Sequence, residues 1–230
     1  MIKLIASDMD GTLLDAHMSI SEENAEAIRF ANEAGIEFMV ATGRNFQEAR
    51  AALDEAGIDC AMITLNGAQV FDKDGHSLFT VPIPTLQATT VLDILDANGI
   101  YYEVSTNQGL YSENQAKRIE SFASMVASHL PHLTYKMAIA MASANLELLH
   151  INYVDSIRDL LTDEKLEVLK IICFHTEGPQ VLGPVGKEIS QLGDLAVTSS
   201  GQNNIEVNHK NAQKGIAVAH VAHERGIPLE

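Results

Sequence analysis

Cysteine is scarce in this chain, which has only Cys60 and Cys173 among its 230 residues. Both lie inside apolar runs, so we expect buried, reduced thiols rather than a disulfide framework. No segment approaches the ~20 consecutive apolar residues that a membrane-spanning helix needs. The stretch before Asp8 is also too short for the apolar core of a signal peptide. These absences predict a cytoplasmic protein without a membrane partner.

Basic residues are also few, with 15 against 31 acidic residues and a formal net charge of -16. Since no run of Lys and Arg offers a stripe for a phosphodiester backbone, nucleic acid is excluded as the expected partner. An acidic surface repels anionic substrates, so such a substrate would need a local positive site or a bound cation. The length and a hydrophobic content of 46% predict two modest folded domains, while the oligomeric state is not predicted.

The first part of the chain alternates strand and helix signals. Ser21 can cap a helix that Gly35 ends, and a second helix over 45–56 ends at Gly57. This alternation predicts a parallel sheet. A hairpin follows, because two apolar segments flank a turn that contains Gly75. The expected strands are Lys3–Ser7, Ile36–Ala41, Cys60–Leu65, Ala68–Phe71 and Ser77–Val81.

Pro82 and Pro84 indicate a linker into a second α/β region. There we expect helices over 85–99, 116–129 and 185–192, with strands over 100–105, 168–174, 195–199 and 205–208. The last stretch, 211–225, reads as a helix that ends at Gly226. The predicted organisation is therefore a core formed by residues 1–81 and 210–230, with a separate domain of residues 82–209 inserted in it.

Asp8 and Asp10 directly follow the first predicted strand. In an open parallel sheet the carboxyl ends of strands face the ligand, and alternation places these two carboxylates on a similar side. Such a pair can hold a cation while one oxygen remains free to attack. The alternative is a polar turn, which Asp-Gly pairs usually form.

A second polar segment, Thr42-Gly43-Arg44, follows the second strand and precedes a helix. Its hydroxyl and amide groups suit a phosphate, although an isolated Thr-Gly is more often a helix N-cap than a phosphate ligand. Asn66-Gly67 follows the third strand, where Asn66 can contact a substrate or shape the turn. Near the start of the last helix, Lys214 can neutralise a phosphoryl group or lie solvated at the surface.

These segments resemble the signatures of haloacid dehalogenase (HAD) phosphatases of the Cof-like branch. The resemblance rests on Asp8-Met9-Asp10-Gly11-Thr12-Leu13, on Thr42-Gly43-Arg44 and on Lys214-Gly215-Ile216-Ala217, and it covers nearly the whole chain. It implies a Rossmann-like parallel-sheet core with an inserted α/β cap domain. It also implies that Asp8 is the nucleophile that forms an aspartyl-phosphate, and that Asp10 is the general acid and base.

The other site residues are assigned from the same resemblance. Thr42 and Lys214 bind or neutralise the transferring phosphoryl group, and Asp8 and Asp10 hold Mg²⁺. The expected phosphate- and substrate-binding residues are Met9, Gly43, Arg44, Asn66, Gly67 and Asn204. Asn204 and Glu206 match a family pattern ahead of the lysine, where a structural role is the alternative. The histidines show no metal-ligand spacing.

The resemblance predicts a Mg²⁺-dependent hydrolase of a small phosphate monoester, such as a sugar phosphate. The family's fourth signature, a Gly-Asp followed by Asn-Asp or Asp after the lysine helix, is not found in the sequence. We therefore expect weaker Mg²⁺ binding, reduced activity, and a core sheet that is incomplete at the C-terminus and leaves Lys3–Ser7 as an apolar edge. The alternatives are a non-catalytic phosphate- or metal-binding fragment and a phosphotransferase or mutase of the same superfamily.

Overall fold

The computed structural model describes residues 2–130, 132–145 and 150–229. The chain divides into two compact units, one formed by Met1–Val81 with Lys210–Glu230 and the other by Pro82–His209. In both units helices pack on a sheet, which is the mixed α/β architecture expected from the sequence. Within the described residues, every helix falls short of the length and apolar content that a membrane crossing requires.

The first unit contains a five-stranded sheet in the order β1-β2-β3-β4-β5. The first three strands run parallel, and β4 and β5 form an antiparallel hairpin at the far edge. The elements are β1 (Leu4–Ser7), the turn η1 (Met9–Leu13), α1 (Glu22–Glu33), β2 (Glu37–Ala41), α2 (Phe46–Glu55), β3 (Ala61–Thr64), the turn η2 (Leu65–Gly67), β4 (Gln69–Phe71), β5 (Ser77–Thr80) and α8 (Lys214–Glu224).

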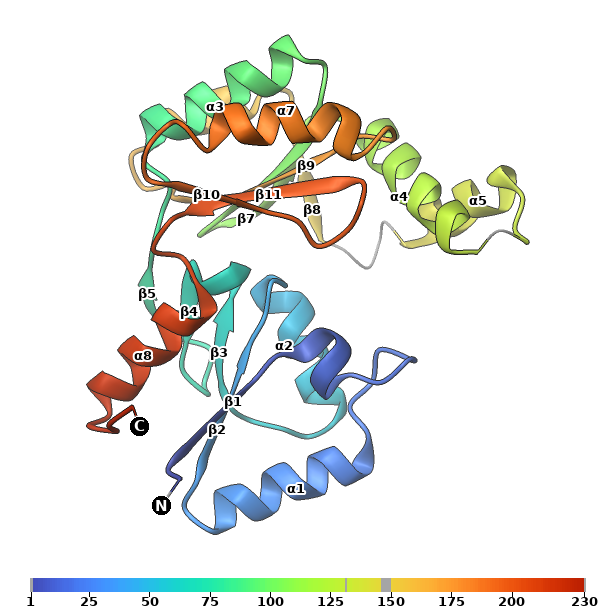
Figure 1. Ribbon diagram of the computed structural model, residues 1–230. Coiled ribbons are helices and arrows are strands. Elements are labelled where there is room, and N and C mark those ends of the chain that lie inside the picture. Colours follow the sequence, from blue (N-terminus) through green and yellow to red (C-terminus); the bar gives the residue numbers. More distant parts are fainter. Residues whose placement is uncertain (1, 131, 146–149, 230) are drawn as a thin grey trace. The chain divides into compact units, whose positions relative to one another are not determined.

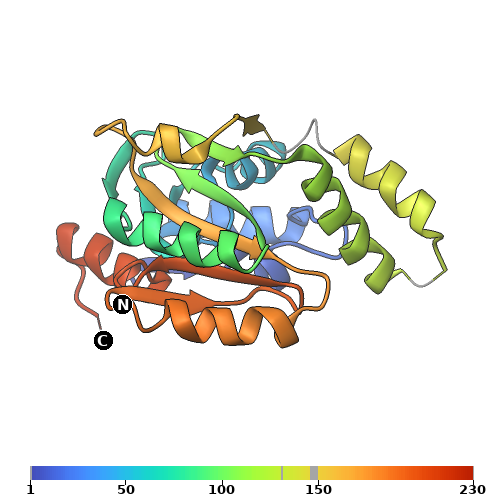
Figure 2. The ribbon, with the colours of Figure 1, turned by 90° about the horizontal axis from the view of Figure 1, so that it is seen from above.

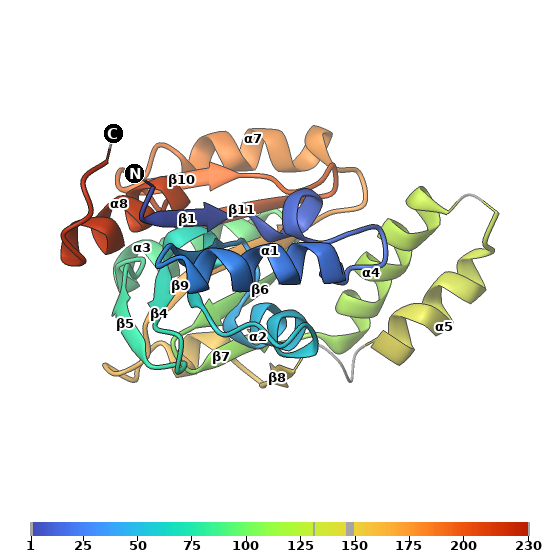
Figure 3. The same ribbon diagram turned by 90° about the horizontal axis from the view of Figure 1, so that it is seen from below.

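Helices cover both faces of this sheet. The backbone N–H of Asn24 donates to Ser21 Oγ (3.2 Å), so Ser21 caps α1 as predicted. Helix α1 buries Ile28 in a cluster with Phe38 and Val40 of β2, and Figure 3 shows this helix lying along the β1–β2 side of the sheet. On the opposite face of the sheet, α8 packs against Met39, which lies between Phe38 and Val40 on β2. The central strands are therefore buried on both faces, as parallel strands usually are.

The second unit contains a six-stranded sheet in the order β10-β11-β9-β6-β7-β8. All neighbouring strands in it are antiparallel except β7 and β8. The elements are α3 (Thr85–Ala97), β6 (Tyr101–Thr106), β7 (Gly109–Ser112), α4 (Gln115–His129), α5 (Tyr135–Asn145), β8 (Ile151–Tyr153), α6 (Ile157–Leu160), β9 (Val168–Phe174), α7 (Pro179–Ile189), β10 (Leu195–Thr198) and β11 (Asn204–His209).

Helices α3 and α7 lie side by side on one face of the six-stranded sheet (Figures 1 and 2). They bury Leu92, Leu95 and Leu182 against Ile171 and Val207 of the strands. Burying such side chains contributes roughly 1.5–3 kcal/mol each, so this layer holds the unit together. Helices α4 and α5 pack on each other as a hairpin beside the sheet (Figure 2).

The boundaries of α7 differ from the prediction, because this helix begins at Pro179 rather than near Val185. Two Gly-Pro pairs in this segment are typical of loops, which is why the sequence pattern misplaced its start. Pro179 is tolerated because the first helical position needs no N–H donor. Pro184 lies inside the helix and removes one backbone hydrogen bond, while the neighbouring Val185 remains buried in the sheet cluster. Packing therefore outweighs local propensity here.

Both cysteines are free and buried, as the sequence predicts. Burial raises the pKa of the Cys60 thiol to about 12 and also raises the pKa of Cys173. Since the thiolate is the reactive form, neither cysteine is a candidate nucleophile.

Candidate active site

Asp8 lies where β1 ends, and its two carboxylate oxygens have different partners. The Met9 backbone N–H donates to Oδ1 (2.7 Å), and Lys214 Nζ lies 2.9 Å from Oδ2. Lys214 is the first residue of α8, so residues far apart in the sequence meet here. Both side chains are partly exposed, at 44% for Asp8 and 35% for Lys214, which leaves them accessible to a small anion.

Asp10 lies in the turn after β1, where Gly11 adopts a φ of +71° that favours glycine. Arg44 holds the Asp10 carboxylate in a fork: Nε donates to Oδ2 (3.0 Å) and Nη2 to Oδ1 (2.7 Å). Two parallel contacts fix the orientation of the carboxylate as well as its position. The sequence placed both residues in the site but did not predict their pairing, which depends on how two loops meet.

Thr42 is fully buried at the end of β2 and organises the loop that carries Arg44. The Arg44 backbone N–H donates to Thr42 Oγ1 (3.2 Å), a short-range turn contact. The N-cap of α2 is Asn45, whose side chain accepts from the Glu48 N–H (2.9 Å). The alternative interpretation of Thr42 as this helix's N-cap is therefore wrong.

Loops after β2 and β3 are joined through their backbones. Asn66 N–H donates to the Thr42 carbonyl (3.0 Å), and Leu65 N–H donates to the Arg44 carbonyl (2.9 Å). Asn66 has a φ of +65°, so this residue shapes the turn between β3 and β4. The sequence pattern left two roles open for Asn66, which were to shape this turn or to contact the substrate.

Gly67 sets the position of Lys214. A Cβ atom built on Gly67 would lie 2.6 Å from the backbone carbon of Gln213, the residue just before Lys214. Its φ of +108° also favours glycine. The start of α8 can therefore approach the β3 loop only because residue 67 has no side chain. The sequence analysis did not identify Gln213, because a local sequence pattern carries no signal for a close contact between the backbones of residues 67 and 213.

Asp8, Asp10, Arg44 and Lys214 form one cluster at the carboxyl ends of the parallel strands. Two anionic and two cationic side chains balance there, although the whole chain carries a formal net charge of -16. The two cations make this cluster locally neutral, so a phosphate ester meets less repulsion here than at acidic parts of the surface. Such a cluster can bind an anion, and a carboxylate within it can act as a nucleophile.

Asn204 lies in the other unit, at the start of β11. Its side-chain carbonyl accepts from the backbone N–H groups of Ser200 and Gly201, both at 3.1 Å. Nearby, Glu206 Oε2 lies 3.0 Å from Lys170 Nζ, and both side chains are buried. These contacts stabilise the turn before β11 and the sheet, while the substrate role of Asn204 stays a prediction.

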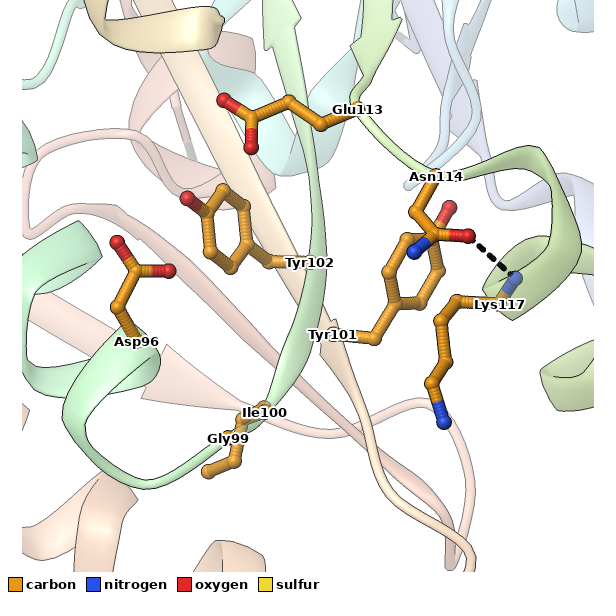
Figure 4. Close-up of a pocket in the computed structure, with 8 residues that line it drawn as sticks. All are labelled: Asp96, Gly99, Ile100, Tyr101, Tyr102, Glu113, Asn114 and Lys117. Atoms are coloured by element: carbon orange, nitrogen blue, oxygen red, sulfur yellow. Dashed lines mark hydrogen bonds between the residues drawn. The ribbon is translucent and has the colours of Figure 1, made fainter. Parts of the chain in front are cut away.

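A cavity of about 260 Å³ lies in the second unit (Figure 4). It holds none of the predicted site residues, and its polar groups have protein partners: Arg158 donates to Asp96 (2.7 Å), and Ile157 N–H donates to Glu113 (2.6 Å). Its lining residues are Asp96, Gly99, Ile100, Tyr101, Tyr102, Glu113, Asn114 and Lys117. The cluster around Asp8 therefore remains the candidate site.

Known proteins resemble this chain over its full length. The family model for haloacid dehalogenase-like hydrolases matches residues 5–230. Phosphatase YwpJ of Bacillus subtilis is 30% identical over 231 residues, which cover 100% of this chain and 81% of that protein. The 5-amino-6-(5-phospho-D-ribitylamino)uracil phosphatase YwtE of the same organism is 31% identical over 232 residues, which cover 100% of this chain and 79% of that protein.

The fold is also that of a solved relative. A haloacid dehalogenase-like hydrolase from B. subtilis superimposes with a TM-score of 0.84 and 29% identity, over 99% of this chain and 80% of that chain. The family match, the full-length relatives and the mixed α/β fold agree with one another. This chain therefore belongs to the haloacid dehalogenase-like hydrolase family.

Proposed function

We propose that the protein is a Mg²⁺-dependent phosphate-monoester hydrolase that works through an aspartyl-phosphate on Asp8. The Met1–Val81 and Lys210–Glu230 segments would form the catalytic core. Pro82–His209 would be the cap that selects a small phosphorylated metabolite. The observation that carries this proposal is the 2.9 Å contact between Lys214 Nζ and Asp8 Oδ2, beside the fork between Arg44 and Asp10.

In the first step, Asp8 Oδ attacks phosphorus while the bond from phosphorus to the ester oxygen breaks. Asp10 gives a proton to the departing oxygen, so the product leaves as an alcohol. In the second step, Asp10 takes a proton from water as the water oxygen attacks the same phosphorus. The bond to Asp8 breaks, inorganic phosphate departs, and Asp8 is restored. Lys214 offsets the charge that the nucleophile and the phosphoryl oxygens share.

Arg44 would keep Asp10 directed at the leaving oxygen. Its two N–H donors occupy one acceptor site on each Asp10 oxygen, so the remaining lone pairs can still take up a proton. A phosphate ester offers the guanidinium an alternative anionic partner. Since a guanidinium has five N–H donors, Arg44 would be able to contact a phosphoryl oxygen while it still holds Asp10.

Magnesium fits the chemistry of this donor set. Asp8 and Asp10 present carboxylates that are 44% and 51% exposed, and Mg²⁺ is commonly bound by one or two carboxylates with water and phosphate oxygens. Within the described ranges, no group of three or more His, Cys, Asp and Glu side chains could hold a metal. When bound, the ion would offset charge between Asp8 and the phosphoryl group.

The substrate class rests on the size of the proposed cap and on the relatives. YwtE is named for a phosphorylated ribityl compound, which is a small phosphate monoester. We place the activity in the cytoplasm, where thiols such as Cys60 and Cys173 stay reduced. Asn66, Gly67, Gly43, Met9 and Thr42 would line or shape the phosphoryl site, and Asn204 would act from the cap.

Asp8→Asn should lower turnover of p-nitrophenyl phosphate by at least about 10³-fold, because the amide is a poor nucleophile. Asp74→Asn is the matched control, since Asp74 lies exposed in the β4–β5 turn, where it pairs with the neighbouring Lys73. Steady-state kinetics of both variants and the unchanged chain provide the comparison. Activity that survives in Asp8→Asn excludes Asp8 as the nucleophile, and an inactive unchanged chain favours a phosphate-binding module.

Arg44→Lys should reduce kcat about 10- to 100-fold, because an ammonium cannot form the two-pronged contact that orients Asp10. The control is Arg50→Lys on α2, where the same change affects surface pairs with Asp54 and Asp59. Kinetic measurements on both variants separate kcat from KM. An Arg44→Lys enzyme with unaltered kcat would contradict the proposed restraint on Asp10.

Removal of divalent ions with EDTA should abolish activity, and excess Mg²⁺ should restore it. Mg²⁺ should also raise the Tm of the unchanged chain, because ion binding favours the folded state, and this rise should be smaller in Asp8→Asn. Thermal unfolding and activity are followed in parallel. Full activity in EDTA, or an identical Tm shift in both proteins, argues against Mg²⁺ at Asp8.

A further inference from the structure

Three consecutive residues at the end of β3 have positive φ angles. Leu65, Asn66 and Gly67 have φ values of +49°, +65° and +108°, and Leu65 is buried. Positive φ is easy for glycine and tolerated by asparagine, but it is unfavourable for a bulky residue such as leucine. Such a backbone persists only where its surroundings hold it, often at functional sites. The turn of residues 65–67, which we name the β3 turn, is therefore held by its neighbours.

One set of contacts joins the β3 turn to the loop that carries Arg44. The Leu65 N–H donates to the Arg44 carbonyl (2.9 Å), and the Asn66 N–H donates to the Thr42 carbonyl (3.0 Å). Both donors belong to residues with positive φ, so an ordinary backbone at these two positions would direct the N–H groups elsewhere. The placement of Arg44, and with it the fork on Asp10, therefore depends on the β3 turn.

A second contact joins the same turn to the start of α8. A Cβ atom on Gly67 would lie 2.6 Å from the Gln213 backbone carbon and 2.7 Å from its carbonyl oxygen. That oxygen accepts from the Ala217 N–H (2.9 Å), a hydrogen bond that closes the first turn of α8. A side chain at position 67 would therefore displace the start of the helix, and Lys214 would move away from Asp8.

We infer that Asn66 and Gly67 are positioning residues, and that the β3 turn places both cations of the site. Asn66 adopts the positive φ that keeps the turn bonded to the Arg44 loop. Gly67 allows the close approach that brings Lys214 to Asp8. Neither role requires a contact with the substrate. The inference rests on the proposed function, because both cations are assigned to that reaction.

Two substitutions of Asn66 separate a turn-shaping role from a contact with substrate. Glycine adopts positive φ without steric cost, whereas alanine does not. Asn66→Gly should therefore keep kcat within about threefold of the unchanged chain. Asn66→Ala should lower kcat about 10-fold or more with a nearly constant KM, because it misplaces groups that act in the transition state. Steady-state kinetics with p-nitrophenyl phosphate give both constants.

Two results with these variants overturn the proposal. Equal loss of activity in Asn66→Gly and Asn66→Ala would assign the side chain to the substrate. Full activity in Asn66→Ala would show that the conformation of the turn does not matter to the reaction.

Gly67→Ala tests the contact with α8. The added methyl group should lower kcat about 10- to 100-fold. In a crystal structure of the variant, the separation of Lys214 Nζ and Asp8 Oδ2 should grow from 2.9 Å to more than about 4 Å, beyond the range of an ion pair. Gly57→Ala is the matched control, because Gly57 also has a positive φ, +64°, but a Cβ there would meet nothing within 4 Å. An intact contact in Gly67→Ala, or equal loss of kcat in the control, contradicts the proposal.

The structural readout distinguishes failure of this inference from failure of the proposed function. An unchanged chain without turnover would exclude the proposed hydrolysis, while the crystal structure of Gly67→Ala still decides whether residue 67 positions Lys214. If Gly67→Ala does not fold, a crystal structure of Asn66→Ala decides the role of the turn. Loss of the hydrogen bond from the Leu65 N–H to the Arg44 carbonyl is then expected, and its retention would contradict the inference.

Discussion

The contact between Lys214 and Asp8 is the constraint on which the site depends. It joins the end of β1 to the start of α8, and it exists only if the start of α8 lies against the loop after β3. Gly67 allows that approach, because any larger residue would meet the backbone of Gln213. A side chain at position 67 would therefore move the cation away from the carboxylate without touching either of them.

The pair formed by Arg44 and Asp10 likewise depends on the backbone of neighbouring loops. Arg44 lies in the loop after β2, where its backbone N–H donates to the Thr42 hydroxyl. Backbone N–H groups of Leu65 and Asn66, which follow β3, donate to carbonyl groups of the same loop. Hydrogen bonds of the backbone thus set the position of the charged groups, while the side chains remain exposed enough to meet a ligand. Preorganisation of this kind is what lets a few charged groups stabilise a developing anion.

Much of this arrangement could be predicted from the sequence. Continuous apolar runs, ended by Gly35 and Gly57, indicate the parallel strands and helices of the first unit, and polar residues at the strand ends indicate the site. The rest depends on tertiary contacts that have no local signal, such as the fork between Arg44 and Asp10 and the close approach of Gly67 to Gln213. In the second unit, α7 begins among Gly-Pro pairs because burial of Leu182 and Val185 favours the helix over the local turn preference.

In the proposed reaction the Asp8 carboxylate, paired with Lys214, receives the phosphoryl group. Rapid acid quench during turnover, followed by mass spectrometry of proteolytic peptides, tests this claim most directly. If Asp8 is the nucleophile, one acid-stable, hydroxylamine-sensitive phosphoryl group should appear on the peptide that contains Asp8. A phosphoryl group on any other residue, or turnover in which the protein is never phosphorylated, would contradict it.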